Sequence, residues 1–103
     1  MSFVYVWQYE VEADAVEDFE RIYAPGGDWT ELFERGGGYV HTELHRDADE
    51  PLRYITFDYW ESRDDRDSFR NAFSTEFEEL DVRCEALVDS ESFVGDFVTV
   101  EPA

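Results

Sequence analysis

The sequence predicts an α+β fold in which four antiparallel strands form one sheet with helices packed on one of its faces. Three observations predict it. Four segments are rich in β-branched and aromatic residues, the stretches after the first and third of them repeat apolar residues at helical spacing, and clusters of Gly, Pro and Asp separate the segments. A chain of 103 residues is long enough for one hydrophobic core, so we expect a single domain over residues 1–103.

The first half of the chain predicts a strand followed by two helices. The segment FVYVWQYEV, residues 3–11, begins with apolar residues on both of its alternating faces, which is typical of a central strand. From residue 13 to 23 the apolar residues recur every three or four positions, and Pro25 with two glycines ends this helix. In the next segment, DWTELFERGGG, we expect Asp28 to cap a short helix and Glu31 to complete a capping box.

The second half predicts a hairpin, a long helical region and a last strand. Strands over residues 39–46 and 53–60 flank the turn signal DADEP and form the hairpin. Residues 61–88 are helical, with Ser62 and Asp65 as the capping pair and a break near residues 74 and 75. A strand over residues 91–100 closes the sheet, with a bulge or close packing at Gly95. This order of elements is that of the split βαβ, or ferredoxin-like, arrangement.

The charge of the chain is extreme, with 27 acidic residues against eight basic ones and a net charge of −19. All the basic residues are arginines. High salt would screen the repulsion among these charges, so we interpret the composition as halophilic; arginine-favouring codon usage in a mesophile is the alternative. Nucleic acids and anionic membranes are not expected partners, since binding phosphate requires a basic patch.

Cysteine usage and the N-terminal sequence indicate a cytoplasmic protein. The lone cysteine, Cys84, excludes an internal disulfide and any multi-cysteine metal site, and its apolar neighbours predict that it is buried. The N-terminal segment has neither the basic region of a signal peptide nor an apolar run long enough to span a bilayer.

Alternation along the hairpin strands divides their side chains between two faces. One face of the third strand would carry Tyr54, Thr56, Asp58 and Trp60, and the other Ile55, Phe57 and Tyr59. We assign the second, apolar set to the helix-covered core and the first set to the open face of the sheet, together with Tyr39, His41, Glu43 and His45. Aromatic residues on an open face must be covered, and a second copy of the chain is the usual solution. We therefore expect a homodimer.

Several segments together resemble a known family. They are FVYVWQYEV, FERIYAPGGDWTELFERGGGYVHTELHRD, RYITFDYWESRDDRDSFRNAF and ALVDSESFVGDF, and the most telling feature is the strand that ends in Trp60 and is followed by ESRDDRDSF. The chain resembles the antibiotic biosynthesis monooxygenase domain of the dimeric α/β-barrel superfamily over nearly its whole length. The resemblance implies a ferredoxin-like protomer whose sheet packs on that of a second copy to form a barrel.

The superfamily includes cofactor-independent monooxygenases that act on aromatic polyketides, haem-degrading enzymes and proteins without known activity, so the resemblance leaves the chemistry open. Haem-degrading members present a histidine ligand at about the position of Phe69 or Arg70, and neither residue can ligate iron. The resemblance therefore implies a small-molecule protein without a cofactor, and among its activities a monooxygenase acting on a phenolic or aromatic substrate.

The candidate catalytic pair is His41 with Asp58. If the hairpin strands pair as expected, the two side chains lie within one register step of each other, and a histidine held by a carboxylate is a base suited to neutral pH. We expect Trp7, Tyr39, Trp60 and Asn71 to contact the substrate, because aromatic walls suit a flat phenol.

Alternative interpretations remain open at this stage. His41 and Asp58 can equally form a cross-strand polar pair with no catalytic role. His45, Glu43 and Asp47 are acceptable metal ligands, but residues near a hairpin turn of so acidic a chain are usually solvated, and we expect no metal site. The protein can also be a non-catalytic dimer that binds small molecules or is associated with stress, or an accessory domain that stabilises a partner.

Overall fold

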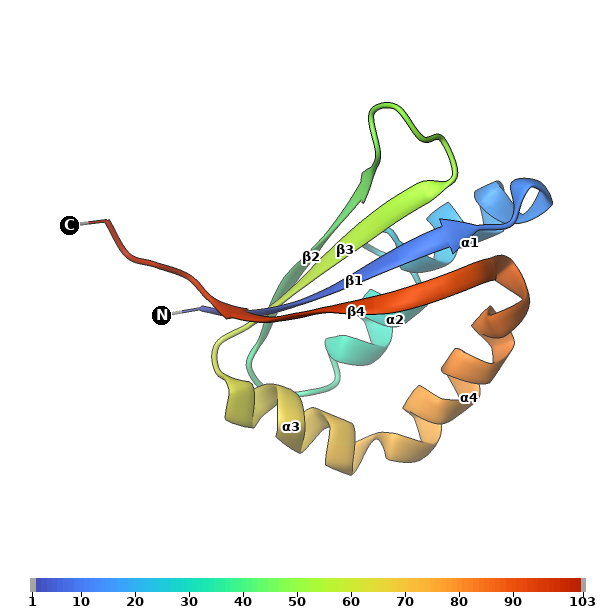
Figure 1. Ribbon diagram of the computed structural model, residues 1–103. Helices are drawn as coiled ribbons and strands as arrows, with labels where there is room; N and C mark the ends of the chain where they lie inside the picture. The colour runs from blue at the N-terminus through green and yellow to red at the C-terminus, as the bar shows by residue number, and fades with distance from the viewer. Residues whose placement is uncertain (1, 103) are drawn as a thin grey trace.

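The computed structural model describes residues 2–102 and shows a four-stranded antiparallel sheet with helices against one face (Figure 1). The strands are β1 (Phe3–Val11), β2 (Tyr39–Arg46), β3 (Arg53–Trp60) and β4 (Val88–Val98), in the order β2-β3-β1-β4. The fold is α+β and ferredoxin-like, as predicted. The central position of β1 follows from its apolar residues on both faces.

Four α-helices and two short 3₁₀ turns connect the strands. They are η1 (Ala13–Ala15), α1 (Val16–Tyr23), α2 (Asp28–Phe33), α3 (Arg63–Ala72), α4 (Ser74–Cys84) and η2 (Glu85–Leu87). The predicted break in the last helical region is present, since Phe73 alone separates α3 from α4. Figure 1 shows α3 and α4 running end to end along one side of the sheet. No helix within residues 2–102 is both long and apolar enough to cross a membrane.

Of the two helix caps predicted from the sequence, one is confirmed and one is wrong. Ser62 caps α3, and its hydroxyl accepts a hydrogen bond of 3.1 Å from the backbone N–H of Asp65. The predicted capping role of Asp28 is wrong, because Asp28 is the first residue of α2 and Gly27 occupies the cap position. A side chain at Gly27 would collide with the carbonyl oxygens of Arg21 and Ile22, so only glycine fits this approach of the chain to α1.

The core lies between the sheet and the helices and consists largely of aromatic side chains. Trp60 and Phe19 have no exposed surface, and Phe33 packs on Trp60 at 5.8 Å and on Phe69 at 5.4 Å between ring centroids. Edge-to-face and tilted pairs of this kind add to the stabilisation that comes from burying apolar area. The predicted burial of Cys84 is confirmed.

The two faces of β3 are the reverse of those predicted. The helix-covered face carries the set that we had assigned to the open face, namely Tyr54, Thr56, Asp58 and Trp60, with 1%, 3%, 6% and 0% of their surface exposed. Ile55, Phe57 and Tyr59 lie on the open face and are partly exposed. The assignment failed because it placed the more apolar of the two sets against the helices, whereas both faces of β3 carry aromatic side chains and Thr56 and Asp58 point into the interior.

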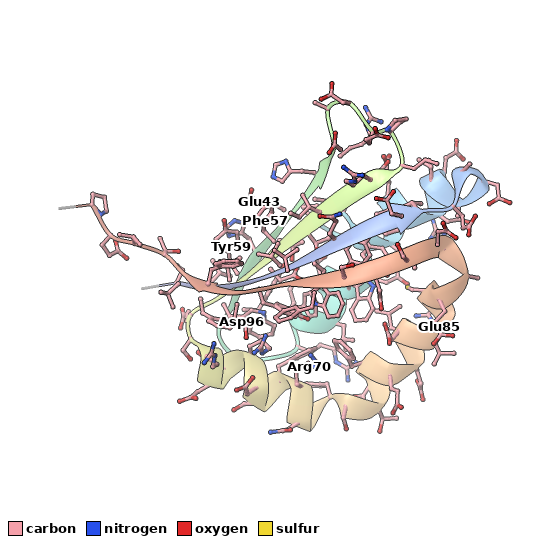
Figure 2. The ribbon with its side chains drawn as sticks, in the orientation of Figure 1. Glu43, Phe57, Tyr59, Arg70, Glu85 and Asp96 are labelled. Atoms are coloured by element: carbon pink, nitrogen blue, oxygen red, sulfur yellow. The ribbon has the colours of Figure 1, made fainter. Side chains whose placement is uncertain are left out.

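A β-bulge in β2 changes the face on which its residues lie. Tyr39 is opposite Trp60 and His41 is opposite Tyr59, so Val40 has no partner between them. One extra residue reverses the alternation at this point, so Tyr39 shares the helix-covered face with Thr42, contrary to the prediction, while His41 lies on the open face as predicted. Figure 2 shows Glu43, Phe57 and Tyr59 on the side of the sheet away from α3 and α4.

Candidate functional site

A cavity of about 120 Å³ lies between the sheet and the helices. Its walls are mainly aromatic and come from β1, β3, β4, α1, α2 and α4; they are Tyr5, Trp7, Tyr9, Tyr23, Trp29, Phe33, Thr56, Asp58, Phe77, Asp81 and Glu91. An apolar cavity of ~150 Å³ holds a benzene molecule. The cavity is thus of the size of one aromatic ring, with carboxyl groups among its walls.

Asp58 is a buried carboxyl group without a positive partner. Within residues 2–102 no arginine or histidine forms an ion pair with it, and its one hydrogen bond is a 2.7 Å bond that the Thr42 hydroxyl donates to Oδ1. Burial raises the pKa of Asp58 from 3.8 to about 7, and the bond from Thr42 opposes this rise. Asp58 therefore exists in both protonation states near neutral pH, as a general acid or base requires.

A chain of hydroxyl groups connects Asp58 to the edge strand. Thr42 lies directly opposite Asp58, and the Tyr39 hydroxyl lies 2.7 Å from Thr42 Oγ1. Because the single Thr42 proton is directed at Asp58, Tyr39 must donate to Thr42 when the carboxyl group is ionised. Both hydroxyls thereby stabilise the charged form of Asp58.

An outer groove of about 550 Å³ adjoins the cavity. Tyr5 and Trp7 line both spaces, and the other lining residues of the groove are Arg66, Asp67, Arg70, Asn71, Phe93 and Asp96. The groove lies between β4 and α3, and Figure 2 shows Asp96 and Arg70 in this region. Together the two spaces are large enough for a ligand of more than one ring.

The predicted substrate-binding residues are divided between these spaces and the core. Trp7 lines the cavity and the groove, and Asn71 lines the groove. Tyr39 and Trp60 pack against each other at 5.4 Å and against Phe33, and neither lines the cavity. We therefore assign Tyr39 and Trp60 to the support of the cavity wall, while Trp7 and Asn71 remain candidates for ligand contact.

The predicted pairing of His41 with Asp58 is wrong. His41 lies on the open face with half of its side chain exposed, stacks on Tyr59 at 4.4 Å and has Nε2 3.2 Å from Glu43. His45 contacts the other oxygen of Glu43 at 2.9 Å, and these two hydrogen bonds lower the pKa of Glu43. The sheet separates His41 from Asp58, because His41 lies opposite Tyr59 on the open face, as predicted, whereas Asp58 lies on the helix-covered face.

Comparison with known proteins assigns the chain to a family. The family model described as antibiotic biosynthesis monooxygenase matches residues 2–80, from β1 into α4. The chain belongs to the antibiotic biosynthesis monooxygenase family. No protein in the curated set matches it significantly.

Solved structures share the fold of this family member. SnoaB from Streptomyces nogalater, described as a cofactor-independent oxygenase, is 24% identical, with a TM-score of 0.77 over 98% of this chain and 95% of SnoaB. A Bordetella bronchiseptica protein assigned to the same family is 22% identical, with a TM-score of 0.78 over 97% of this chain and 98% of that protein. A conserved protein from Methanosarcina mazei is 14% identical, with a TM-score of 0.70 over 94% and 91%.

The two residues that lie directly opposite Asp58, Thr42 and Tyr5, were not predicted from the sequence as site residues. The register of the hairpin, which is continuous from the pair Arg46–Tyr54 to the pair His41–Tyr59, places Thr42 opposite Asp58. Tyr5 was assigned to a strand but not to the site, although it lies directly opposite Asp58 on the other neighbouring strand. The one signal that the sequence offered was Asp58 itself, an acidic residue within an otherwise apolar and aromatic strand.

Proposed function

We propose that this family member is a cofactor-independent monooxygenase that oxidises a phenolic ring bound in the cavity, with Asp58 as the general base. The observation that carries the proposal is a buried carboxyl group that has no positive partner and opens into an aromatic cavity of single-ring size. A base with a pKa near 7 removes protons efficiently at neutral pH.

The chemistry that this arrangement supports begins with transfer of the phenolic proton to Asp58. The resulting phenolate is electron-rich, gives one electron to dioxygen and then combines with the superoxide to form a carbon–oxygen bond. Asp58 returns its proton to the terminal peroxide oxygen. Loss of the ring hydrogen as a proton and cleavage of the O–O bond then release water and leave a quinone. One dioxygen is consumed, and its atoms appear in the new carbonyl group and in water.

The comparisons support this proposal without extending to the substrate. The family takes its name from monooxygenases, and SnoaB is described as a cofactor-independent oxygenase. Identity of 24% supports a shared fold, and the proposed activity rests on Asp58 and its cavity.

The test is dioxygen consumption with 1,8-dihydroxyanthrone in molar potassium chloride, with a chelator present and without added flavin or metal. We expect the wild type to exceed the rate without protein, to form the corresponding quinone and to consume one dioxygen per quinone. Asp58→Asn removes the base and should lose at least about 100-fold in rate. Asp64→Asn, which replaces an exposed carboxylate of α3 outside the cavity and the groove, is the matched control.

Failure has two distinguishable forms. If the wild type consumes no dioxygen but the phenol quenches the fluorescence of Trp7 in a saturable way, the protein is the non-catalytic binding protein of the alternative interpretation. If Asp58→Asn turns over as fast as the wild type, the cavity is an oxygenase site but Asp58 is not its base.

We further propose that the protein is a homodimer formed through the open face of the sheet. Val4 and Val6 point to this face from β1, Phe57 and Tyr59 from β3, and Phe97 from β4 is 49% exposed. An aromatic and aliphatic face of this kind is covered at low cost by an identical face related by a two-fold axis. The cavity lies on the other side of the sheet.

A further inference from the structure

Arg70 differs from the other arginines near the site in its surroundings. Arg66 donates two hydrogen bonds to Asp96 at 3.1 and 3.3 Å and one to Asp67 at 2.8 Å, and Arg63 lies 3.5 Å from Asp96. Within residues 2–102, Arg70 forms no ion pair with a carboxylate. Six of the eight arginines form such a pair, and besides Arg70 only Arg46, at the end of β2, forms none within the described residues.

The position of Arg70 connects the outer groove to the inner cavity. Its guanidinium group lines the groove and lies over the ring of Phe77, 4.1 Å from the centroid, and Phe77 is a wall of the cavity. Arg70 also acts on the buried hydroxyl of Tyr5, whose pKa burial raises and the positive charge of Arg70 lowers. Figure 2 shows Arg70 in the space between the sheet and the helices.

From this geometry we infer that Arg70 binds the carboxylate of an aromatic acid whose phenolic ring occupies the inner cavity. This inference rests on the proposed function, since it names the class of substrate for the same site. The guanidinium group presents paired donors that match a carboxylate. Its contact with the Phe77 ring keeps the group at the groove. Asn71, next in α3 and also lining the groove, offers an amide donor.

The charge of the groove favours a monoanion over a phosphate dianion. Asp96 and Asp67 pair with Arg66 and leave one unpaired positive group, Arg70. A dianion would bring a second negative charge beside these two carboxylates, which disfavours it. In a chain of net charge −19, an anionic substrate also needs one local positive group to offset the general repulsion.

Calorimetric titration with 6-hydroxy-2-naphthoate and its methyl ester tests the inference. Both ligands carry the phenol, and only the first carries a charge. We expect the wild type to bind the acid about tenfold more tightly than the ester, because a charge-assisted pair is stronger than a neutral contact. Arg70→Gln should lose this preference by weakening the acid about tenfold with the ester unchanged, and Arg70→Lys should retain part of it.

Arg83→Gln is the matched control, because Arg83 is an exposed arginine of α4 that pairs with Asp28 outside the groove. Its preference for the acid should equal that of the wild type. Melting curves of each variant verify that it is folded.

Each of the other outcomes overturns a specific claim. Equal affinity of the wild type for acid and ester, or equal weakening of both ligands by Arg70→Gln, overturns the role of Arg70 and leaves the oxygenase proposal intact. Binding of the acid through Arg70 without dioxygen consumption overturns the oxygenase proposal and leaves the carboxylate site. If the wild type binds neither ligand, both proposals fail.

Discussion

Thr42 lies directly opposite Asp58 in the sheet, and its hydroxyl donates a 2.7 Å hydrogen bond to the carboxyl group. His41, the neighbour of Thr42 in the chain, lies on the opposite face. The polar partner of Asp58 is therefore a neutral hydroxyl, and this difference determines how the carboxyl group titrates. A protonated histidine would have lowered the pKa of Asp58, whereas a hydroxyl leaves the effect of burial dominant.

Removal of this hydrogen bond should raise the pKa of Asp58 further. In Thr42→Val the ionised carboxyl group loses its donor, so we expect the half-maximal point of the pH–rate profile to move to higher pH by about one unit. The carboxyl ¹³C shift of Asp58 provides the same titration without reference to activity. Thr42→Ser keeps the hydroxyl and His41→Ala lies on the other face, so both should retain the wild-type titration. An unchanged titration in Thr42→Val would contradict the assigned role.

Asp58 should make the stability of the fold depend on pH. Burial raises the pKa of Asp58 from 3.8 to about 7 in the folded protein. Between these values the folded state retains a proton that the unfolded state has released, so the free energy of unfolding falls as pH rises through this window and levels off above it. Asp58→Asn removes the effect. The variant should exceed the wild type in stability above about pH 7, by ~4 kcal/mol at most.

Urea unfolding of both proteins at one protein concentration and one salt concentration, from about pH 4 to pH 8, measures this difference. If the difference in free energy of unfolding between Asp58→Asn and the wild type stays constant over this range, the pKa of Asp58 is not raised as described.

The dimer proposal predicts the effect of a charge on the open face. The chain has a mass of 12.1 kDa, and sedimentation equilibrium in molar potassium chloride should give twice this mass. Tyr59→Asp buries an unpaired carboxylate in the proposed interface, so this variant should sediment as a monomer. Val82→Asp is the control, because Val82 is 59% exposed on α4. A wild-type monomer at every concentration would rule out the barrel.

Salt should stabilise the protein. At a net charge of −19, repulsion extends over about 10 Å at 0.1 M salt and over about 3 Å at 1 M salt. The exposed ion pairs, such as Arg21 with Asp18 at 3.0 Å, weaken with salt but contribute little each. We therefore expect the melting midpoint to rise continuously from dilute buffer to concentrated potassium chloride. A flat profile would favour the codon-usage interpretation.

The accuracy of the sequence-based predictions varied with the range of the interaction. The Ser62 cap and the break between α3 and α4 were predicted correctly, since each depends on residues within a turn or two. Asp28 was wrongly predicted to cap α2, because the close approach of Gly27 to α1 moved the cap by one residue. In the site, Asp58 and Trp7 were identified and do share a cavity, whereas His41 was placed beside Asp58 because Asp58 was assigned to the wrong face of β3.

The sequence by itself determined the elements, their order, the central position of β1 and the presence of one carboxyl group in an aromatic strand, because propensity, periodicity and turn residues act over short distances along the chain. Only the tertiary structure decided which face of β3 is interior and which side chain meets Asp58. The unpaired residue Val40 moves Tyr39 to the helix-covered face, and the register of the hairpin sets Thr42 against Asp58. Both faces of β3 carry aromatic side chains, so hydrophobicity alone does not distinguish the face that packs on the helices from the face left open.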